Sequence, residues 1–211
     1  MDAAIRIKTP DFRFNFKHLF ALLLLAVSIY LSITFGVAWS NSNSTNKQYN
    51  YQDMSEIAEE IYNSGEITEA LKNLPLDAAI IAKMSAEIEG ILAKTTDNEG
   101  CEVYFLRVRE SNNYPVLAYG NIIIGFVYLR TNETWKVGQT CREQIGRYQN
   151  SVYYSNKQYG LKYTKDDFIY EPIFRGNYKN VLILEKLLIY TYPLWSGHAD
   201  LLKPPGCKIF R

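Results

Sequence analysis

The feature that most constrains the fold is the stretch 125–147, which has the pattern of a strand, a turn, a second strand and the start of a helix. The apolar run at 125–129 predicts a buried strand, and the polar cluster at 131–134 predicts a hairpin turn. Residues 135–140 predict the return strand, and residues 142–147 can begin a helix.

The predicted hairpin places Tyr128 and Lys136 on neighbouring strands, and the helix brings Arg147 back over them. A phenol, an ammonium and a guanidinium would then meet in one small space. Positioned cations stabilise the charge of a phosphate group, and charged side chains are rare in a packed core. The grouping therefore favours a phosphodiester site over a buried core.

Several short motifs follow one another through the C-terminal part of the chain. They are Phe126-Val127-Tyr128, Lys136-Val137-Gly138-Gln139-Thr140, Arg147, Glu185 within Leu184-Glu185-Lys186-Leu187-Leu188-Ile189, and Pro204-Pro205-Gly206-Cys207-Lys208. Together they resemble the core of the GIY-YIG nucleases over roughly residues 122–211. Bacterial and phage members with a Lys-x-Gly second motif, some carried by predicted toxins, are the most similar group. The resemblance implies an α+β domain with a small antiparallel sheet flanked by helices.

The same resemblance implies roles for individual residues. Tyr128 would orient or deprotonate the attacking water, Arg147 and Lys136 would stabilise charge on the phosphate, and Glu185 would hold Mg²⁺ or Mn²⁺. One carboxylate is adequate for such an ion, because water and phosphate oxygens complete its shell. Substrate contacts would come from three further residues, Arg142, Tyr148 and Lys208.

The chain departs from the family pattern at two of these positions. Lys136 replaces the family's second tyrosine, and its ammonium could lower the pKa of Tyr128. Cys207 stands where a polar residue, commonly Asn, is usual. His198, in a predicted loop, is an alternative base or a surface residue.

Charge is divided unevenly along a chain whose formal net charge is +1. Residues 40–121 carry 13 acidic and 6 basic side chains, whereas residues 122–211 carry 7 acidic and 13 basic ones. A basic half is where nucleic acid would bind, although two halves of opposite charge can also neutralise each other when packed. The expected partner is nucleic acid, with DNA favoured over RNA.

The run 19–39 has no charged residue and is long enough to span a bilayer. Basic residues precede it in the segment 1–18, so the positive-inside rule predicts a cytoplasmic N-terminus. We expect a single-pass anchor in the inner membrane with the folded part outside the cytoplasm. A cleaved signal peptide and a secreted product are the alternative.

Three further parts follow the anchor. Residues 40–50 are polar and predict a flexible linker, and residues 51–98 predict an acidic helical segment. Residues 99–211 predict the GIY-YIG-like domain. Within it, a strand at 102–109 and a return strand near 115–119 would form a hairpin added to the edge of the same sheet.

The domain is completed by a third strand, a last helix and three cysteines. The strand is expected at 167–174, and a helix capped by Asn180 at 181–192. The cysteines, Cys101, Cys141 and Cys207, lack zinc-site spacing, and outside the cytoplasm two of them could pair.

Three functions are compatible with these features. The first is a metal-dependent nuclease, the second a GIY-YIG-like module that binds nucleic acid without cleaving it, and the third a membrane-tethered interaction protein. A protein partner, such as an immunity protein or an inhibitor, is not identified by the sequence.

Overall fold

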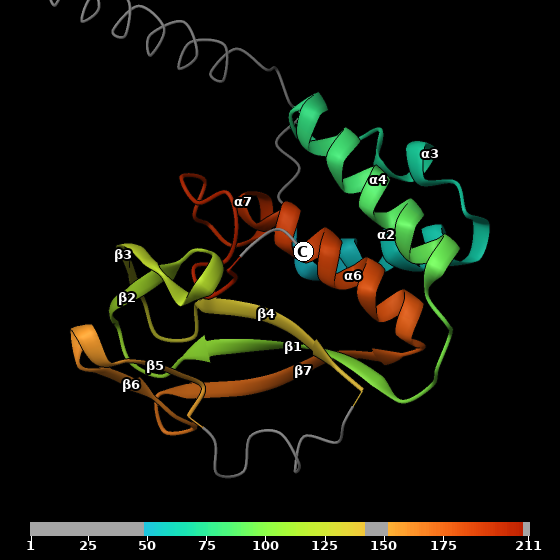
Figure 1. Cartoon of the computed structure of the whole chain (residues 1–211). Helices are drawn as coiled ribbons and strands as arrows, with labels where there is room; N and C mark the ends of the chain where they lie inside the picture. The colour runs from blue at the N-terminus through green and yellow to red at the C-terminus, as the bar shows by residue number, and fades with distance from the viewer. Residues whose placement is uncertain (1–48, 142–151, 209–211) are drawn as a thin grey trace, which may run out of the picture. The chain divides into compact units, whose positions relative to one another are not determined.

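The computed structural model describes residues 49–141 and 152–208, and these belong to one compact unit, Lys47–Arg211. The unit is α+β, with a small antiparallel sheet and helices packed against one of its faces (Figure 1). This confirms the coarse fold class expected from the sequence. The segments 1–18 and 19–39, and with them the predicted anchor, lie outside the described residues.

The helical segment folds as the apolar periodicity predicts, with α2 at Tyr51–Ser64, α3 at Ile67–Leu71 and α4 at Ala78–Lys94. Asn50 caps α2 in a capping box, and Gly65 ends it in the left-handed conformation. The end of the predicted 40–50 linker is therefore part of the fold.

The central sheet has three strands in the order β4-β1-β7, all antiparallel. They are β1 at Cys101–Val108, β4 at Thr134–Thr140 and β7 at Phe168–Gly176. The third strand predicted near 167–174 is thus confirmed. The prediction that β1 lies at an added edge is wrong, because β1 is the central strand and pairs with β4 on one side and with β7 on the other.

Two more strands, β2 at Asn112–Leu117 and β3 at Ile123–Leu129, pair only with each other. Both predicted hairpins are therefore wrong: β3 does not pair with β4, and β1 does not pair with β2. A tight turn explains the difference, since Gly120 and Asn121 both have positive φ (75° and 64°). Such turns favour a local hairpin, and they leave β4 to pair with β1.

A third small hairpin joins β5 at Tyr154–Asn156 to β6 at Leu161–Tyr163 through η2 at Lys157–Tyr159. The two hairpins cover one face of the central sheet, around a core that contains Trp135 and Phe168. The stacked rings of these two residues lie 4.8 Å apart, and the Trp135 indole donates to the carbonyl of Pro115.

The opposite face of the sheet is covered by α6 at Tyr178–Tyr190, which also packs against α2 and α4 (Figure 1). The short helix α7, at Tyr192–Trp195, follows directly. Because α6 lies between the sheet and the other helices, nearly all of its residues are buried. The acidic helical segment and the sheet consequently share one core.

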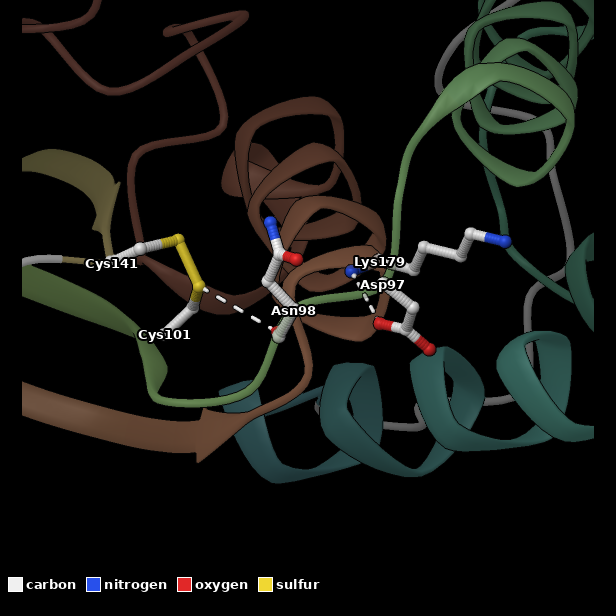
Figure 2. Close-up of a disulfide and its surroundings, with 5 residues drawn as sticks. All are labelled: Asp97, Asn98, Cys101, Cys141 and Lys179. Carbon is white, nitrogen blue, oxygen red and sulfur yellow. Dashed lines mark hydrogen bonds between the residues drawn. A yellow bond between two sulfur atoms is a disulfide. The ribbon is translucent and has the colours of Figure 1, made fainter.

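A disulfide joins Cys101 to Cys141 at one end of the β1–β4 pair (Figure 2). The preceding loop is bonded to the start of α6, since the carbonyl of Asn98 accepts from the amide of Tyr178 and Asp97 accepts from that of Lys179. These contacts explain why α6 begins at Tyr178, three residues before the predicted start at 181. The sequence predicted one pair among three cysteines, and the remaining thiol, Cys207, is buried.

Candidate functional site

A cavity of about 180 Å³ opens beside β4, where the strand, α6 and the C-terminal segment meet. It is lined by Tyr104 of β1, Lys136, Val137, Gly138 and Gln139 of β4, Glu185 and Ile189 of α6, and Gly206, Cys207 and Lys208. Four separate segments of the chain thus contribute to one space. Its polar side chains include two ammonium groups, one carboxylate, one amide and one phenol.

The C-terminal segment is fixed along the free edge of β4. The amide of Gly206 donates to the carbonyl of Trp135 at 2.7 Å, and the Cys207 thiol donates to the carbonyl of Val137 at 3.3 Å. Gly206 is needed for this approach, because a Cβ there would lie 2.6 Å from the Trp135 ring. Lys203 holds the other side by donating to the carbonyls of Leu117 and Cys207.

On β4 itself, Gly138 makes room for the ring of Tyr104, its partner across the strand pair. A Cβ at Gly138 would lie 2.6 Å from the phenol oxygen of Tyr104. The same ring stacks on Tyr170 at 4.5 Å. The phenol is therefore held between β4 and β7, with its position fixed from both sides.

Glu185 supplies the carboxylate of the cavity. Its side chain is only 8% exposed, although glutamates are mostly exposed in folded proteins. It shares the cavity with Lys136 and Lys208, whose ammonium groups can balance its charge or that of a bound anion. The site is thus partly buried and contains more positive than negative groups.

The pKa of the buried Cys207 thiol depends on burial and on the charged residues around it. The pKa of the thiol is raised to about 11, chiefly by burial and also by Glu185, whereas Lys136 and Lys203 act in the opposite direction. The thiol is therefore neutral at physiological pH and acts as a hydrogen-bond donor. Burial also lowers the pKa of Lys203.

The structure brings together three of the residues predicted for the site: Lys136, Glu185 and Lys208. Tyr128 lies elsewhere, 56% exposed on β3 and paired with Asn113 of β2. The expected neighbourhood of Tyr128 and Lys136 is wrong, because their strands belong to different sheets. The other predicted residues, Arg142, Arg147 and Tyr148, lie outside the described residues.

His198 also lies away from the cavity lining. Its Nε2 is 2.9 Å from a carboxylate oxygen of Glu133, and its ring stacks on Tyr192 at 6.4 Å. These contacts join the loop after α7 to the turn before β4, so in this structure His198 has a structural position.

Tyr104 is the residue of the cavity that sequence reasoning missed. Its signal is the sequence Val103-Tyr104-Phe105 in a strand buried on both faces, which predicts a central strand and hence a partner such as β4. The intervening hairpin at 112–129 concealed this pairing, since it supplies a second apolar strand with a tyrosine.

A divalent metal would depend on Glu185. Within 49–141 and 152–208, no group of three or more His, Cys, Asp or Glu side chains could hold a metal ion. A single carboxylate suits Mg²⁺ or Mn²⁺ only when water and phosphate oxygens supply the remaining ligands. The residues fit an ion that enters together with a phosphate group.

Comparisons with protein-family models, with curated proteins and with solved structures find no match for this chain. Among the described residues, no helix is long and apolar enough to cross a membrane. The GIY-YIG resemblance and the predicted anchor at 19–39 both stay predictions.

Proposed function

We propose that this chain is a GIY-YIG-like nuclease that hydrolyses phosphodiester bonds of nucleic acid at the cavity beside β4. The observation that carries the proposal is the meeting of Lys136, Glu185 and Lys208 from three distant segments in one cavity. These residues are up to 72 positions apart in the sequence and still line one cavity. A functional site requires such convergence of side chains, whereas a solvated charged surface does not.

Binding of the substrate is assigned to the ammonium groups. Lys208 is exposed at the rim, and Lys136 lies deeper on β4, so a phosphate group can approach the first and be charge-balanced by the second. Gln139 adds an amide to the same lining. The neutral Cys207 thiol donates a hydrogen bond to the carbonyl of Val137. It therefore helps to form the wall of the cavity and adds no charge.

Glu185 is assigned to a divalent cation, Mg²⁺ or Mn²⁺. A buried carboxylate close to a phosphate would weaken anion binding unless a cation lies between them. When bound, such an ion stabilises charge on the leaving oxygen. The two lysines and Glu185 together orient the phosphate and keep the site electrically balanced.

Tyr104 replaces Tyr128 in this proposal. Its phenol lines the cavity and is fixed by Gly138 and Tyr170, whereas Tyr128 lies on another sheet. A phenol held in this way can orient the attacking water next to the phosphate. In terms of the family resemblance, β1 and β4 would then be the two motif-bearing strands.

The expected location is outside the cytoplasm. The disulfide Cys101–Cys141 supports this, because such bonds persist in oxidising compartments. The uncharged run 19–39 would hold the protein at the inner membrane with its N-terminus in the cytoplasm.

A nucleic-acid-binding module without cleavage is the second candidate. It is favoured by the cavity's single carboxylate and by the neutral thiol of Cys207, since neither offers a strong second metal ligand. In this version Lys136 and Lys208 bind phosphate, and Glu185 only balances their charge.

Plasmid nicking by the purified full chain in detergent tests the proposal. We expect cleavage with Mg²⁺ or Mn²⁺ and none with EDTA. Glu185→Gln should lower the rate by about 10² or more and leave nucleic-acid binding intact, because it removes a repulsive charge. The matched control, Glu89→Gln, changes an exposed carboxylate of α4 and should have no effect.

Two outcomes would contradict this assignment. If Glu185→Gln cleaves at the wild-type rate, Glu185 holds no catalytic metal. If the wild type binds nucleic acid and cleaves with neither ion, the binding module is correct.

A further inference from the structure

The β2–β3 hairpin exposes a row of large apolar side chains on one face. Ile122, Ile124, Phe126 and Tyr128 are 62%, 64%, 49% and 56% exposed. Ile124, Phe126 and Tyr128 lie at alternate positions of β3 and so point to the same side, and Ile122 directly precedes the strand. Ile123 and Val127, which alternate with them, pack against the core that contains Leu129. The row is therefore a true outer face of a strand whose other face is already buried.

This outer face extends beyond β3. The ring of Phe126 lies 6.1 Å from that of Tyr159 in the β5–β6 hairpin. The Tyr159 side chain is 49% exposed. Tyr119, at the turn of the β2–β3 hairpin, is 77% exposed. An apolar surface of this extent on a folded protein normally marks an interaction site.

The sequence of the hairpin indicates what kind of partner it has. The 19 residues 111–129 contain no Asp, Glu, Lys, Arg or His. A surface for nucleic acid requires cations, and a surface for a soluble protein normally has a polar rim with charged residues. A surface that enters lipid excludes charges, because a charged side chain is costly in the apolar part of a bilayer.

Three further features agree with lipid. Tyrosines at the ends of the row suit the boundary between head groups and acyl chains. All six residues of β2 pair with β3, so the edges at which the two strands face each other are hydrogen-bonded within the hairpin. Arg130 and Lys157 flank the face and are placed to meet anionic head groups.

The predicted anchor would keep the hairpin close to a membrane. The uncharged run 19–39 is long enough to span a bilayer, and 11 residues (40–50) separate it from α2. Even fully extended, residues 40–48 span at most about 32 Å, so the folded unit stays within reach of the membrane surface. A tethered surface binds its target far more readily than a free one.

We propose that the outer face of the β2–β3 hairpin (Tyr119, Ile122, Ile124, Phe126 and Tyr128) inserts into the lipid surface of the membrane that anchors the chain. The anchor holds the protein at the membrane, and the hairpin fixes its orientation there. The proposal does not depend on the nuclease activity. It also gives Tyr128 a role that its exposure supports, in place of the catalytic role expected from the sequence.

Photo-crosslinking to lipid tests this. The full chain is reconstituted into vesicles of phosphatidylcholine and phosphatidylglycerol that contain a diazirine phospholipid, and adducts are located by mass spectrometry. We expect adducts in 119–130 as well as in 19–39. Peptides from the exposed side of α2 serve as the internal background.

A matched pair of variants sharpens the test. Ile124→Asp places a charge in the exposed face and should lower the adduct yield in the hairpin about tenfold. Leu202→Asp changes another large exposed apolar side chain, outside the hairpin, and should leave that yield unchanged. Plasmid cleavage by both variants should equal that of the wild type, which separates this proposal from the nuclease assignment.

Several results would overturn the proposal. These are a hairpin yield equal to the α2 background, an unchanged yield in Ile124→Asp, or failure of the full chain to associate with the vesicles. Cross-links between the hairpins of two copies that persist when the protein is diluted with lipid would identify a second copy as the occupant instead.

Discussion

The cavity beside β4 and the outer face of β3 lie on two strands of the same length that differ in composition, in burial and in pairing. On β4, an ammonium, a glycine and an amide face charged groups from α6 and the C-terminal segment, and the space is partly closed. On β3, apolar side chains point outward and no charged residue occurs along the strand. The difference follows from pairing: β4 pairs with the central strand β1, whereas β3 pairs only with β2. The chemistry and the docking that we propose are thereby assigned to different sheets.

Removal of the disulfide should give the largest effect, because it lowers the stability of the folded unit that contains both regions. Cys101 and Cys141 close a loop of 40 residues, a constraint that contributes about 4 kcal/mol to the free energy of unfolding. We expect the double variant Cys101→Ser, Cys141→Ser to unfold at a much lower guanidinium concentration. Cys207→Ser is the control for loss of a thiol. A stability equal to that of the wild type would show that the bond does not form in the native protein.

A glycine comparison distinguishes the two strands directly. Gly138→Ala should destabilise the protein by about 1–3 kcal/mol and abolish cleavage, because the new methyl group would displace the Tyr104 ring that lines the cavity. Gly125→Ala is the matched control on β3, where a Cβ meets no atom within 4 Å. Equal melting temperatures and equal nicking rates for the two variants would contradict the position assigned to Tyr104.

Much of the fold could be predicted from the sequence, because local patterns determine most helices and strands. The helices α2, α3 and α4 lie within the helical segment expected at 51–98, and the strands β1, β4 and β7 lie close to their expected ranges. Pairing could not be predicted as well, since it depends on which strand is buried on both faces. The Gly120-Asn121 turn was an available signal for the β2–β3 hairpin, and it was outweighed by the clearer polar cluster at 131–134.

The site was predicted in part for the same reason. Lys136, Glu185 and Lys208 were identified by residue type and motif, and the structure places them in one cavity. Tyr104 was missed and Tyr128 was expected beside Lys136 in its place, because both tyrosines lie in apolar strands with similar local sequence. Only the strand order distinguishes them, and strand order depends on long-range contacts.

Stability at alkaline pH should reflect the environment of Cys207. Its pKa is raised to about 11 in the folded protein, so the folded state retains a proton that the unfolded state loses near its ordinary pKa of 9.0. Stability from this group is therefore fully present below pH 9 and is lost as the pH rises toward about 11. The loss amounts to about 2 kcal/mol.

The control for this effect is Cys207→Ser, which keeps a donor to Val137 and has no titration in this range. Tyrosines with raised pKa values, Tyr114 and Tyr163 among them, also contribute above pH 10, and they contribute equally in both proteins. Unfolding free energies measured from pH 8 to 11 should therefore converge for the two proteins. Parallel curves would mean that the thiol is accessible to water.

The smallest effect is expected from substitution of His198, which lies outside both regions. The experiment distinguishes a structural role of this histidine from a catalytic one. His198 contacts Glu133 at 2.9 Å and stacks on Tyr192, so His198→Ala should lower the free energy of unfolding by about 1 kcal/mol. Nicking should continue at nearly the wild-type rate, because the imidazole is not among the residues that line the cavity. His198→Gln keeps a hydrogen-bonding group near Glu133 and should recover part of the stability. If both variants instead lose cleavage by about 10² while their melting temperatures stay normal, the general base is His198 and the water is not oriented by Tyr104.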